Sequence, residues 1–454
     1  MSAARPGAGR LSGAVVWVAV LSYAALWFRL GVWRYDVFRA SYDDGVFTQV
    51  LSSAFSAFRA RPEFNFNHLA THFSPDLFLL APLVVATHST LTMIAAQALA
   101  GGLVAPPLYF IARRRMPDAL AAGCALVALL YPPLAGVTFA DFHENGIEPA
   151  AIVWLLWAVD SGRMWTSLIV GLFALGIKED VAPGMFAGGL AAGVWLLRRG
   201  DAARARIAFA LSACAAAAFA AYLAVLRPAL HAPFPFQQFR FYNGDDSGAP
   251  DPGGALRRLR YVVDMLLPLA FVPLLSPVAF CLALPGLLEI LASRNPITMS
   301  LETHYAAVWI GYMLFAYVCG LSTIARRSRR AAALVLAVSA ALCLFVQIKL
   351  DPSARWYALY RAPGAHDATL QAMLDALPPD AAISAPDRIY AHLGFDPNAD
   401  VAPGGRFVIL DRTNNDVTPQ WAQYEAELPG LVSAGTYRLV RSVDGIELYE
   451  KNAP

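Results

Sequence analysis

The chain has 454 residues, of which 57% are hydrophobic and 15% are charged. A soluble domain carries about 25% charged residues, so this composition excludes an ordinary soluble protein and indicates that most of the chain lies in a lipid bilayer. The formal net charge of +2, without a long block of like charge, argues against a protein that binds nucleic acid.

The N-terminal segment starts with basic residues and continues into an apolar run from Leu11 to Phe28. A secretory signal peptide has a shorter apolar region and ends at a small-residue cleavage site, and this segment has neither feature. We therefore expect a retained first transmembrane helix.

Apolar segments recur as far as residue 349 and predict about eleven transmembrane helices, although several are shorter than the roughly 20 residues that a crossing requires. They lie at 11–33, 91–112, 118–138, 148–162, 164–177, 181–197, 207–226, 263–276, 277–292, 305–325 and 331–349. With a cytoplasmic N-terminus, the arginine-rich connections 113–115, 198–206 and 326–330 all fall on the cytoplasmic side, as the positive-inside rule requires. This pattern predicts an integral protein of a bacterial-type inner membrane.

The first outer connection, 34–90, is long and contains two short amphipathic segments, 44–58 and 74–87, which suit helices lying in the membrane interface. After residue 349 the sequence alternates between apolar and polar residues in short runs separated by Pro, Gly and Asn, a pattern typical of strands. We therefore predict a transmembrane domain over 1–349 and a small soluble extracytoplasmic α/β domain over 350–454.

Ionisable residues gather at the predicted outer ends of the spans. Charge at membrane depth is costly, so such groups usually face a water-filled cavity or one another. The distribution therefore predicts a polar cavity at the outer face. The residues are Asp43, Asp44, His68, His72, Asp76, His143, Glu144, Glu148, Lys178, Glu179, Asp180, Glu302 and His304.

The stretch "SYDDGVFTQV" places Asp43 and Asp44 directly before an apolar-periodic run. An aspartate in this position commonly caps a helix N-terminus, but a second adjacent aspartate exceeds what a cap needs. Two interpretations stay open: the pair serves only the helix start, or it is the catalytic centre and a carboxylate site for a divalent cation. For a site built from carboxylate and phosphate oxygens the expected cation is Mg²⁺ or Mn²⁺.

His68 and His72 are four residues apart, which on a helix is the spacing of a metal-binding pair. However, no HExxH glutamate lies between them, and the Asn and Ser-Pro residues around them suggest an irregular loop. Hydrogen bonding to a sugar or a phosphate is the interpretation we favour over metal binding.

Three further polar segments have both an ordinary and a functional interpretation. The segment 139–149, "FADFHENGIEP", is either a solvated turn or part of a packed cavity, and the cluster 178–180, "KED", is either mutually neutralised or a site. Glu302 and His304 lie in "SLETHY", where an ordinary loop is the alternative.

These motifs together resemble a known family. The order "YDDGVFTQ", "HFSP", "PPLYFIARR", "FHENGIEPA", "KEDVA" and "THY", over most of residues 40–310, is similar to the DUF2079 membrane proteins, which are related to the GT-C superfamily of glycosyltransferases. The resemblance implies a GT-C fold, an acidic active-site residue in the first outer loop, and a cavity that admits a polyprenyl-phosphate sugar.

The family's opening motif is Tyr-Asp-apolar-Gly-apolar-Phe-Asp-Gln. Carried over, its first aspartate falls on Asp43 and its glutamine on Gln49, whereas Asp44 stands where the family has an apolar residue and Thr48 where it has a second aspartate. These departures leave open which aspartate does the chemistry.

The resemblance implies transfer of a sugar from a polyprenyl-phosphate donor in the membrane lipid to an acceptor. A carboxylate within hydrogen-bond reach of the acceptor hydroxyl would act as the base, and we expect Asp43 in that role. Positive charge for the leaving phosphate is expected from Lys178, Arg240 and Arg258, since arginine pairs with phosphate in bidentate fashion. Glu144, Glu148 and Glu179 are expected to hold sugar hydroxyls or to complete a metal shell.

Two other functions compete with transfer. A transporter or flippase for a lipid-linked glycan would also have many spans, but the sequence has no inverted repeat and its polar groups cluster at one face rather than at mid-depth. A non-catalytic assembly protein, with a tail that binds an unknown protein partner, is the second alternative.

Overall fold

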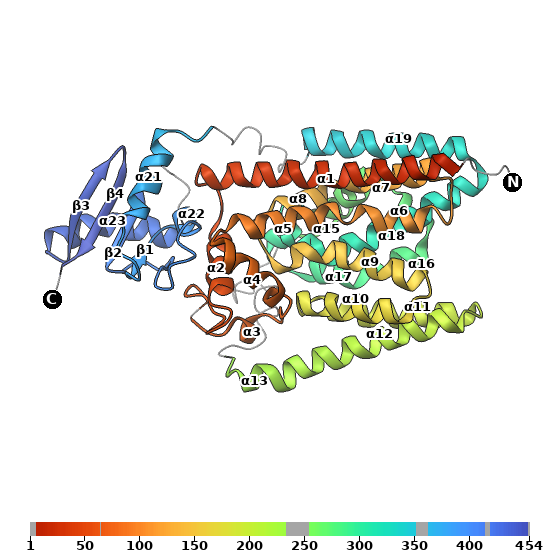
Figure 1. The fold of residues 1–454 in the computed structure, drawn as a ribbon, viewed down its shortest axis with the longest axis horizontal. Helices are drawn as coiled ribbons and strands as arrows, with labels where there is room; N and C mark the ends of the chain where they lie inside the picture. The colour runs from red at the N-terminus through yellow and green to blue at the C-terminus, as the bar shows by residue number, and fades with distance from the viewer. Residues whose placement is uncertain (1–5, 64, 233–253, 351–361, 414–417, 453–454) are drawn as a thin grey trace.

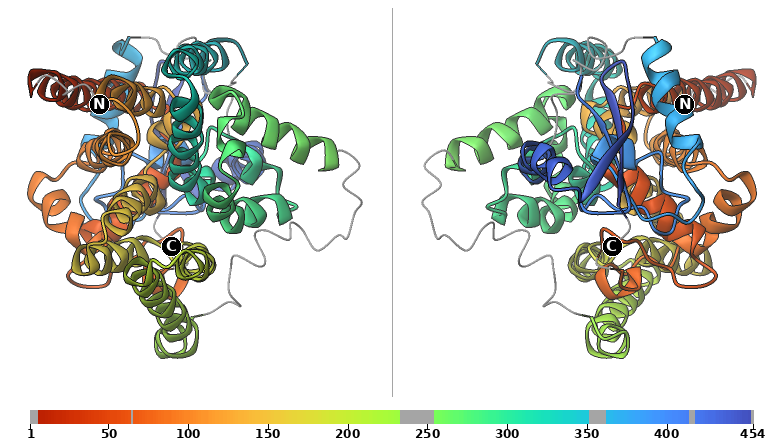
Figure 2. Two further views of the ribbon diagram at one scale, coloured as in Figure 1. Left: turned by 90° about the vertical axis from the view of Figure 1, so that its right-hand side faces the viewer. Right: turned by 90° about the vertical axis from the view of Figure 1, so that its left-hand side faces the viewer.

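The computed structural model describes residues 6–63, 65–232, 254–350, 362–413 and 418–452. Most helices run along one long axis, and a small α/β unit lies at one end of the bundle, opposite the end where α1 (Pro6–Asp36) begins (Figure 1). Figure 2 shows the same ribbon viewed along the long axis from each of its two ends.

The first part of the chain is entirely helical. After α1 come α2 (Tyr42–Ser52), α3 (His68–Thr71), α4 (Leu77–Thr87), α5 (Leu91–Gly102), α6 (Ala105–Ala112), α7 (Asp118–Leu129), α8 (Pro132–Phe139), η1 (Glu144–Ile147), α9 (Glu148–Asp160), α10 (Met164–Ile177), α11 (Val181–Arg198), α12 (Ala202–Ala221), η2 (Tyr222–Leu226) and α13 (Arg227–Ala229).

The second part continues with short helices before two long ones. These are α15 (Gly254–Leu266), η3 (Leu267–Leu269), η4 (Val272–Leu275), α16 (Pro277–Phe280), η5 (Cys281–Ala283), α17 (Leu284–Ala292), η6 (Pro296–Met299), η7 (His304–Ala306), α18 (Ala307–Arg327), α19 (Arg329–Phe345) and η8 (Val346–Leu350).

Within the described residues, six helical segments are long and apolar enough to cross a membrane. They are Gly9–Asp36, Leu91–Ala112, Val181–Arg198, Ala202–Ala229, His304–Arg327 and Arg329–Ile348. A seventh crossing is added if α7 and α8, which are bent by 49° at their junction, are one span. The structure therefore has six or seven candidate crossings, and the expected count of about eleven is not confirmed.

The difference comes from helices that are apolar but short. With 13 and 14 residues, α9 and α10 are each only about 20 Å long at 1.5 Å per residue, whereas the hydrocarbon core is about 30 Å thick. The segment expected to span at 263–276 instead contains the turns η3 and η4, each with a proline in its first turn, because proline cannot supply an interior helical hydrogen bond.

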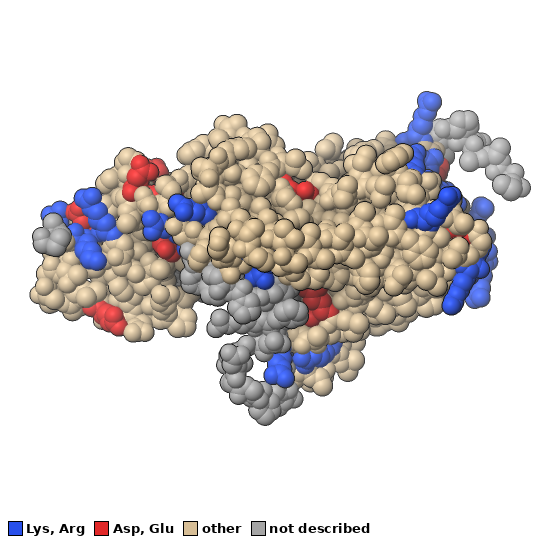
Figure 3. All heavy atoms as spheres, turned by 90° about the horizontal axis from the view of Figure 1, so that it is seen from below, with Lys and Arg blue, Asp and Glu red and all other residues tan. Residues whose placement is uncertain are grey.

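The surface carries an uneven distribution of charge. Figure 3 shows Lys and Arg side chains gathered at the end of the bundle opposite the α/β unit, a mostly uncharged surface along the middle, and mixed charges at the α/β end. The positive-inside rule expects an end that is rich in Lys and Arg, such as the one opposite the α/β unit, on the cytoplasmic side.

The C-terminal α/β unit contains α21 (Ala365–Asp375), β1 (Ile383–Ser384), α22 (Asp387–Tyr390), β2 (Phe407–Asp411), α23 (Pro419–Ser433), β3 (Tyr437–Val443) and β4 (Ile446–Lys451). Its sheet has the strand order β1-β2-β4-β3, in which β1 pairs parallel with β2 and the other pairs are antiparallel. Trp421 and Leu428 of α23 are buried against one face of this sheet.

The other face of the sheet shares a hydrophobic core with the first outer loop. Phe47 and Leu51 of α2 pack in one buried cluster with Leu370 of α21 and Ile409 of β2. The domain boundary expected at residue 350 stays a prediction. The hydrophobic core contains residues from both sides of it and fixes the α/β unit against α2.

Candidate functional site

The site begins at the N-terminus of α2. The backbone of Ser41, the residue before the helix, is extended, but its side chain makes no capping hydrogen bond. Its backbone N–H instead donates to Asp141 Oδ1 at 3.0 Å. Asp43 and Asp44 both lie in the first helical turn, where a negative charge is favourable because the helix macrodipole is positive at that end.

Asp44 is fully buried and fastens α2 to its neighbours. Its Oδ1 accepts the backbone N–H of Phe142 at 2.8 Å, and its Oδ2 lies 3.6 Å from the guanidinium of Arg34. Arg34 also bonds Asp141 at 2.9 Å and the carbonyl oxygen of Phe139 at 2.7 Å. Asp44 therefore holds together the end of α1, the start of α2 and the segment after α8.

Asp43 faces a different environment from its neighbour. Its side chain is 24% exposed and lines a cavity, where Oδ2 lies 3.6 Å from Nε2 of His143. The His143 ring stacks on His304 with centroids 3.4 Å apart, and its Nδ1 lies 3.1 Å from the carbonyl oxygen of Asp141. Since a carbonyl can only accept, Nδ1 carries the proton, and the Nε2 lone pair is directed at Asp43.

The surroundings change the proton affinity of all three groups. Burial and the nearby Asp141 carboxylate raise the pKa of Asp43 well above its usual range. Burial also raises the pKa of Asp44 to about 7, against the opposing effect of Arg34. Burial lowers the pKa of His143 to about 4, so this imidazole is neutral at physiological pH.

The cavity that Asp43 lines has a volume of about 860 Å³, within the usual range of ligand-binding sites. His143 and His304 form part of its wall. The charged residues that line it are Arg34, Arg39, Asp43, Asp141, Glu302 and Arg388. Of the residues expected at a polar cavity, the structure thus brings together Asp43, His143, Glu302 and His304.

The other expected residues form a second, buried cluster. Lys178 Nζ lies 3.1 Å from Glu144, and both side chains are at least nine-tenths buried. His72 Nδ1 lies 2.9 Å from Glu179, which also accepts the backbone N–H of Phe73 at 2.6 Å. Lys178 and Glu179 thus have their charged partners outside the 178–180 segment.

The Lys178–Glu144 pair stays ionised in spite of its burial. Burial raises the pKa of Glu144, but Lys178 more than offsets this and lowers it to about 2. Burial lowers the pKa of Lys178, but Glu144 and the neighbouring acids Asp180 and Glu179 raise it to a larger extent. Because neither partner can leave the other without a buried unpaired charge, we assign the pair a structural role.

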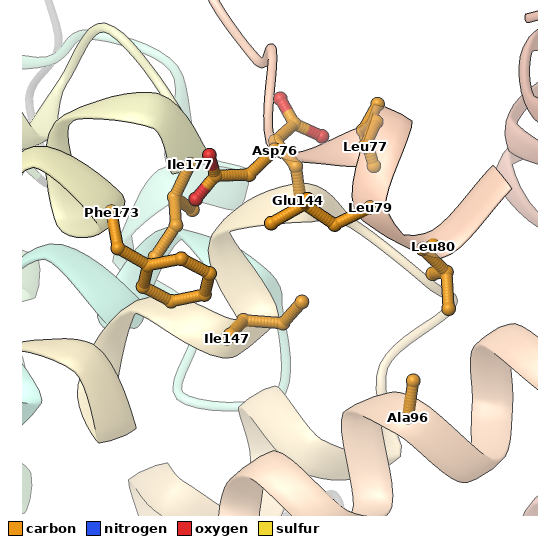
Figure 4. Close-up of a pocket in the computed structure, with 9 residues that line it drawn as sticks. All are labelled: Asp76, Leu77, Leu79, Leu80, Ala96, Glu144, Ile147, Phe173 and Ile177. Carbon is orange, nitrogen blue, oxygen red and sulfur yellow. The ribbon is translucent and has the colours of Figure 1, made fainter. Parts of the chain in front are cut away.

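A smaller cavity of about 170 Å³ lies beside this cluster (Figure 4). Its wall is mainly apolar, with Leu80, Ala96, Ile147 and Phe173 among its side chains, and its two acidic members are Asp76 and Glu144. The small cavity is thus distinct in chemistry from the larger one, whose wall contains six charged side chains.

His68 and His72 do not form a metal site in the part of the chain that the structure describes. Their rings are 5.7 Å apart, and the Nδ1 of His68 lies 2.8 Å from Glu63. The described residues contain no group of three or more His, Cys, Asp or Glu side chains that could hold a metal ion. Asp43 and Asp44 face different partners in the structure, and the expected Mg²⁺ or Mn²⁺ site at this pair stays an untested prediction.

Of the remaining expected residues, those that the structure describes do not line the larger cavity. Arg258 donates to the carbonyl oxygens of Leu291 and Ser293, at 2.6 and 2.8 Å, and so ties α15 to the end of α17. Glu148 and Asp180 begin α9 and precede α11, and neither lines either cavity described above. Arg240 lies outside the described residues.

Sequence reasoning missed three arginines of the cavity: Arg34, Arg39 and Arg388. Arg34 and Arg39 flank the predicted outer end of the first span, where the positive-inside rule does not expect arginine, and that exception is a signal for function. Arg388 is distant in sequence and carries no such signal.

A family model described as "Predicted membrane protein (DUF2079)" matches residues 34–247 and 254–436. No curated protein matches the chain. Among solved structures, the chain is similar to ArnT from Cupriavidus metallidurans bound to undecaprenyl phosphate, with a TM-score of 0.55 and 14% sequence identity over 96% of this chain and 98% of that one. The likeness extends over nearly the whole of both chains and shows that this chain has an ArnT-like fold.

Proposed function

Because this chain belongs to the DUF2079 family of membrane proteins and has an ArnT-like fold, we propose that it is a GT-C-type glycosyltransferase. It transfers a sugar from a polyprenyl-phosphate-linked donor to an acceptor hydroxyl at the outer face of a bacterial-type inner membrane. The N-terminus is then cytoplasmic and the α/β unit extracytoplasmic. The binding of undecaprenyl phosphate by the ArnT structure supports a polyprenyl lipid as the partner.

The observation that carries the proposal is the position of Asp43, a carboxylate that faces a cavity of about 860 Å³ beside a neutral histidine. In the proposed reaction Asp43 accepts the proton of the acceptor hydroxyl as that oxygen bonds to the anomeric carbon. The bond from this carbon to the phosphate oxygen breaks, and polyprenyl phosphate leaves with the electron pair. The raised pKa of Asp43 makes it a stronger base than an ordinary carboxylate.

His143 has a supporting role in this mechanism. Its Nδ1–H donates to the carbonyl oxygen of Asp141, and its ring stacks on His304. These two contacts hold the ring so that Nε2 points towards the Asp43 carboxylate. Once Asp43 has taken the proton, its O–H can donate to this lone pair. His143 thereby stabilises the protonated product state of the base.

Lys178 and Arg258, which we expected to meet the leaving phosphate, are bound to Glu144 and to backbone carbonyls. Arg240, the third residue expected in this role, lies outside the described residues. Among the described residues, the arginines of the larger cavity bring positive charge to the phosphate in this proposal. Glu302 and His304 line the same cavity and are placed to bind sugar hydroxyls in this proposal.

Transport of a lipid-linked glycan is the alternative from another class. The larger cavity has charged residues from the first outer loop and from the α/β unit, which places it at the α/β end of the bundle. A transport pathway would need polar groups at mid-depth as well. The location therefore favours transfer, and a non-catalytic assembly role is the remaining alternative.

The test uses the purified full-length protein and a panel of polyprenyl-phosphate sugars, with release of sugar to acceptor or water as the readout. We expect turnover with one donor and its loss, by about a hundredfold or more, in Asp43→Asn. Ser52→Ala, at the far end of the same helix, is the matched control and should retain full turnover. Turnover that survives Asp43→Asn removes Asp43 from the mechanism, and the absence of turnover with every donor favours transport or assembly.

A further inference from the structure

The α/β unit is fastened to the end of α1 and to α2 by specific contacts. The His392 ring is stacked between Tyr35 and Phe38, with centroid distances of 4.0 and 3.9 Å. The Gln49 side-chain amide donates to the carbonyl oxygens of Asp396 and Ala399, at 2.7 and 3.2 Å. These contacts join the α22 region to the helix that carries Asp43.

Two glycines allow this close approach. A Cβ atom at Gly45 would lie 2.7 Å from the Tyr390 ring and from its carbonyl oxygen, and one at Gly394 would lie 2.7 Å from the carbonyl oxygen of Gly45. Neither glycine has a positive φ, so the space, and not the backbone conformation, is what requires glycine here. The α/β unit is consequently seated with backbone-to-backbone contact on the first turns of α2.

This seating places Arg388 of α22 in the wall of the same cavity as Arg39 and Asp43. Burial and the nearby Arg39 guanidinium lower the pKa of Arg388 to about 10. Two cations held near each other repel, and an anion between them would remove that cost. Arg34, the third arginine of the wall, bonds Asp141, so Arg39 and Arg388 add positive charge to the cavity from two segments that are distant in sequence.

From this juxtaposition we propose that Arg39 and Arg388 form a phosphate-binding subsite, so that the α/β unit supplies one half of the substrate site. The inference rests on the proposed function for its biological ligand, a phosphate ester, but the subsite is defined by the two guanidinium groups. Arginine suits this task because its planar fork can donate two parallel hydrogen bonds to phosphate oxygens. The phosphate is either that of a polyprenyl lipid or a free phosphate group.

The test measures binding and not turnover, so it is independent of whether transfer occurs. Purified full-length protein in detergent is titrated with undecaprenyl phosphate, with undecaprenol, and with inorganic phosphate. We expect Arg388→Ala and Arg39→Ala each to raise the Kd for undecaprenyl phosphate at least about tenfold, the typical effect of losing a charge-assisted hydrogen bond. Binding of the uncharged undecaprenol should not change.

Arg441→Ala is the matched control, because Arg441 is an exposed arginine of the same α/β unit on β3 and outside the cavity wall. Arg388→Lys should restore part of the affinity, since it keeps the charge but loses the fork. Competition by inorganic phosphate at millimolar concentration indicates a subsite for phosphate itself, and a lack of competition indicates a lipid phosphate; both outcomes support the subsite.

An unchanged Kd for undecaprenyl phosphate in the Arg39→Ala/Arg388→Ala double variant overturns the proposal, provided that thermal unfolding shows the protein to be folded. An equal loss of undecaprenol affinity also overturns it, because the arginines would then act on structure and not on phosphate. Loss of turnover in Asp43→Asn with retained binding would leave the subsite intact and concern only the proposed function.

Discussion

Nε2 of His143 lies 3.6 Å from the carboxylate of Asp43, while Nδ1 of the same ring is held 3.1 Å from the carbonyl oxygen of Asp141. This relationship orients a neutral imidazole so that its lone pair meets a carboxylate of raised pKa. The two adjacent aspartates thus have different surroundings: Asp43 faces His143 at the cavity, and Asp44 is enclosed by Arg34 and the Phe142 backbone.

The first prediction concerns the pH dependence of turnover. A general base must be ionised, and burial and the nearby Asp141 raise the pKa of Asp43. We therefore expect kcat/KM to rise with pH through an acid limb that lies above the ordinary carboxyl range near pH 4. His143, with a pKa of about 4, is neutral throughout this limb. A limb at the ordinary carboxyl pKa would contradict a raised pKa at the base.

Asp44 has a structural role that a stability measurement can separate from catalysis. Its removal leaves Phe142 N–H and part of the Arg34 charge without a partner in a buried place, so Asp44→Ala should lower the free energy of unfolding by about 3 kcal/mol. Asp44→Asn keeps an acceptor oxygen and should cost less. Thermal unfolding in detergent measures both, and Asp43→Asn should be near wild type. Equal stability of the Asp44→Ala protein would contradict this assignment.

The Lys178–Glu144 pair predicts non-additive substitutions. Lys178→Met leaves a buried carboxylate without its cation and should cost about 3 kcal/mol of stability, whereas Lys178→Met/Glu144→Gln should recover most of that loss. A double-mutant cycle on unfolding free energy measures the coupling. If the double variant is less stable than either single one, the pair is not held together by charge.

The close approach of the α/β unit to α2 depends on Gly45. Because a Cβ would lie 2.7 Å from Tyr390, Gly45→Ala should destabilise the protein by about 1–3 kcal/mol and increase proteolysis of the α/β unit. Gly430 of α23 has no atom within 4 Å of an added Cβ, so Gly430→Ala is the control and should be neutral or slightly stabilising. Equal protease resistance of the two variants would refute the packing argument.

His366 forms two ion pairs within the α/β unit, and their contribution to stability depends on pH. Its Nδ1 lies 2.9 Å from Asp444 and its Nε2 3.1 Å from Asp411, and these carboxylates raise the pKa of His366 although burial lowers it. A raised histidine pKa contributes stability that is complete below the unfolded value near 6.5 and is lost as pH rises through the folded pKa. Unfolding of the wild type should therefore become easier as the pH rises above about 6.5, and His366→Gln should remove that dependence. An identical pH dependence in the variant would exclude His366 as its source.

The residues that the sequence identified divide into two groups in space. Asp43, His143, Glu302 and His304 meet at the larger cavity, because each ends or precedes a predicted span at the outer face. Lys178, Glu144, Glu179 and His72 were expected in the same cavity but pair with one another at a separate place. A hydropathy pattern gives the depth of a residue along the bundle axis, but it does not give the side of the bundle on which the residue lies.

The amino-acid sequence by itself determined the membrane class, the polar outer end and the family, because hydropathy, the placement of arginine and an ordered set of motifs are local properties of the chain. Only the tertiary structure decided which aspartate faces the cavity. It also joined Arg388 to Arg39 across about 350 residues of sequence. These choices depend on long-range packing: the buried core that the α/β unit shares with α2 and the missing side chains at Gly45 and Gly394. No local pattern encodes such contacts, since their energy exists only once both partners are folded.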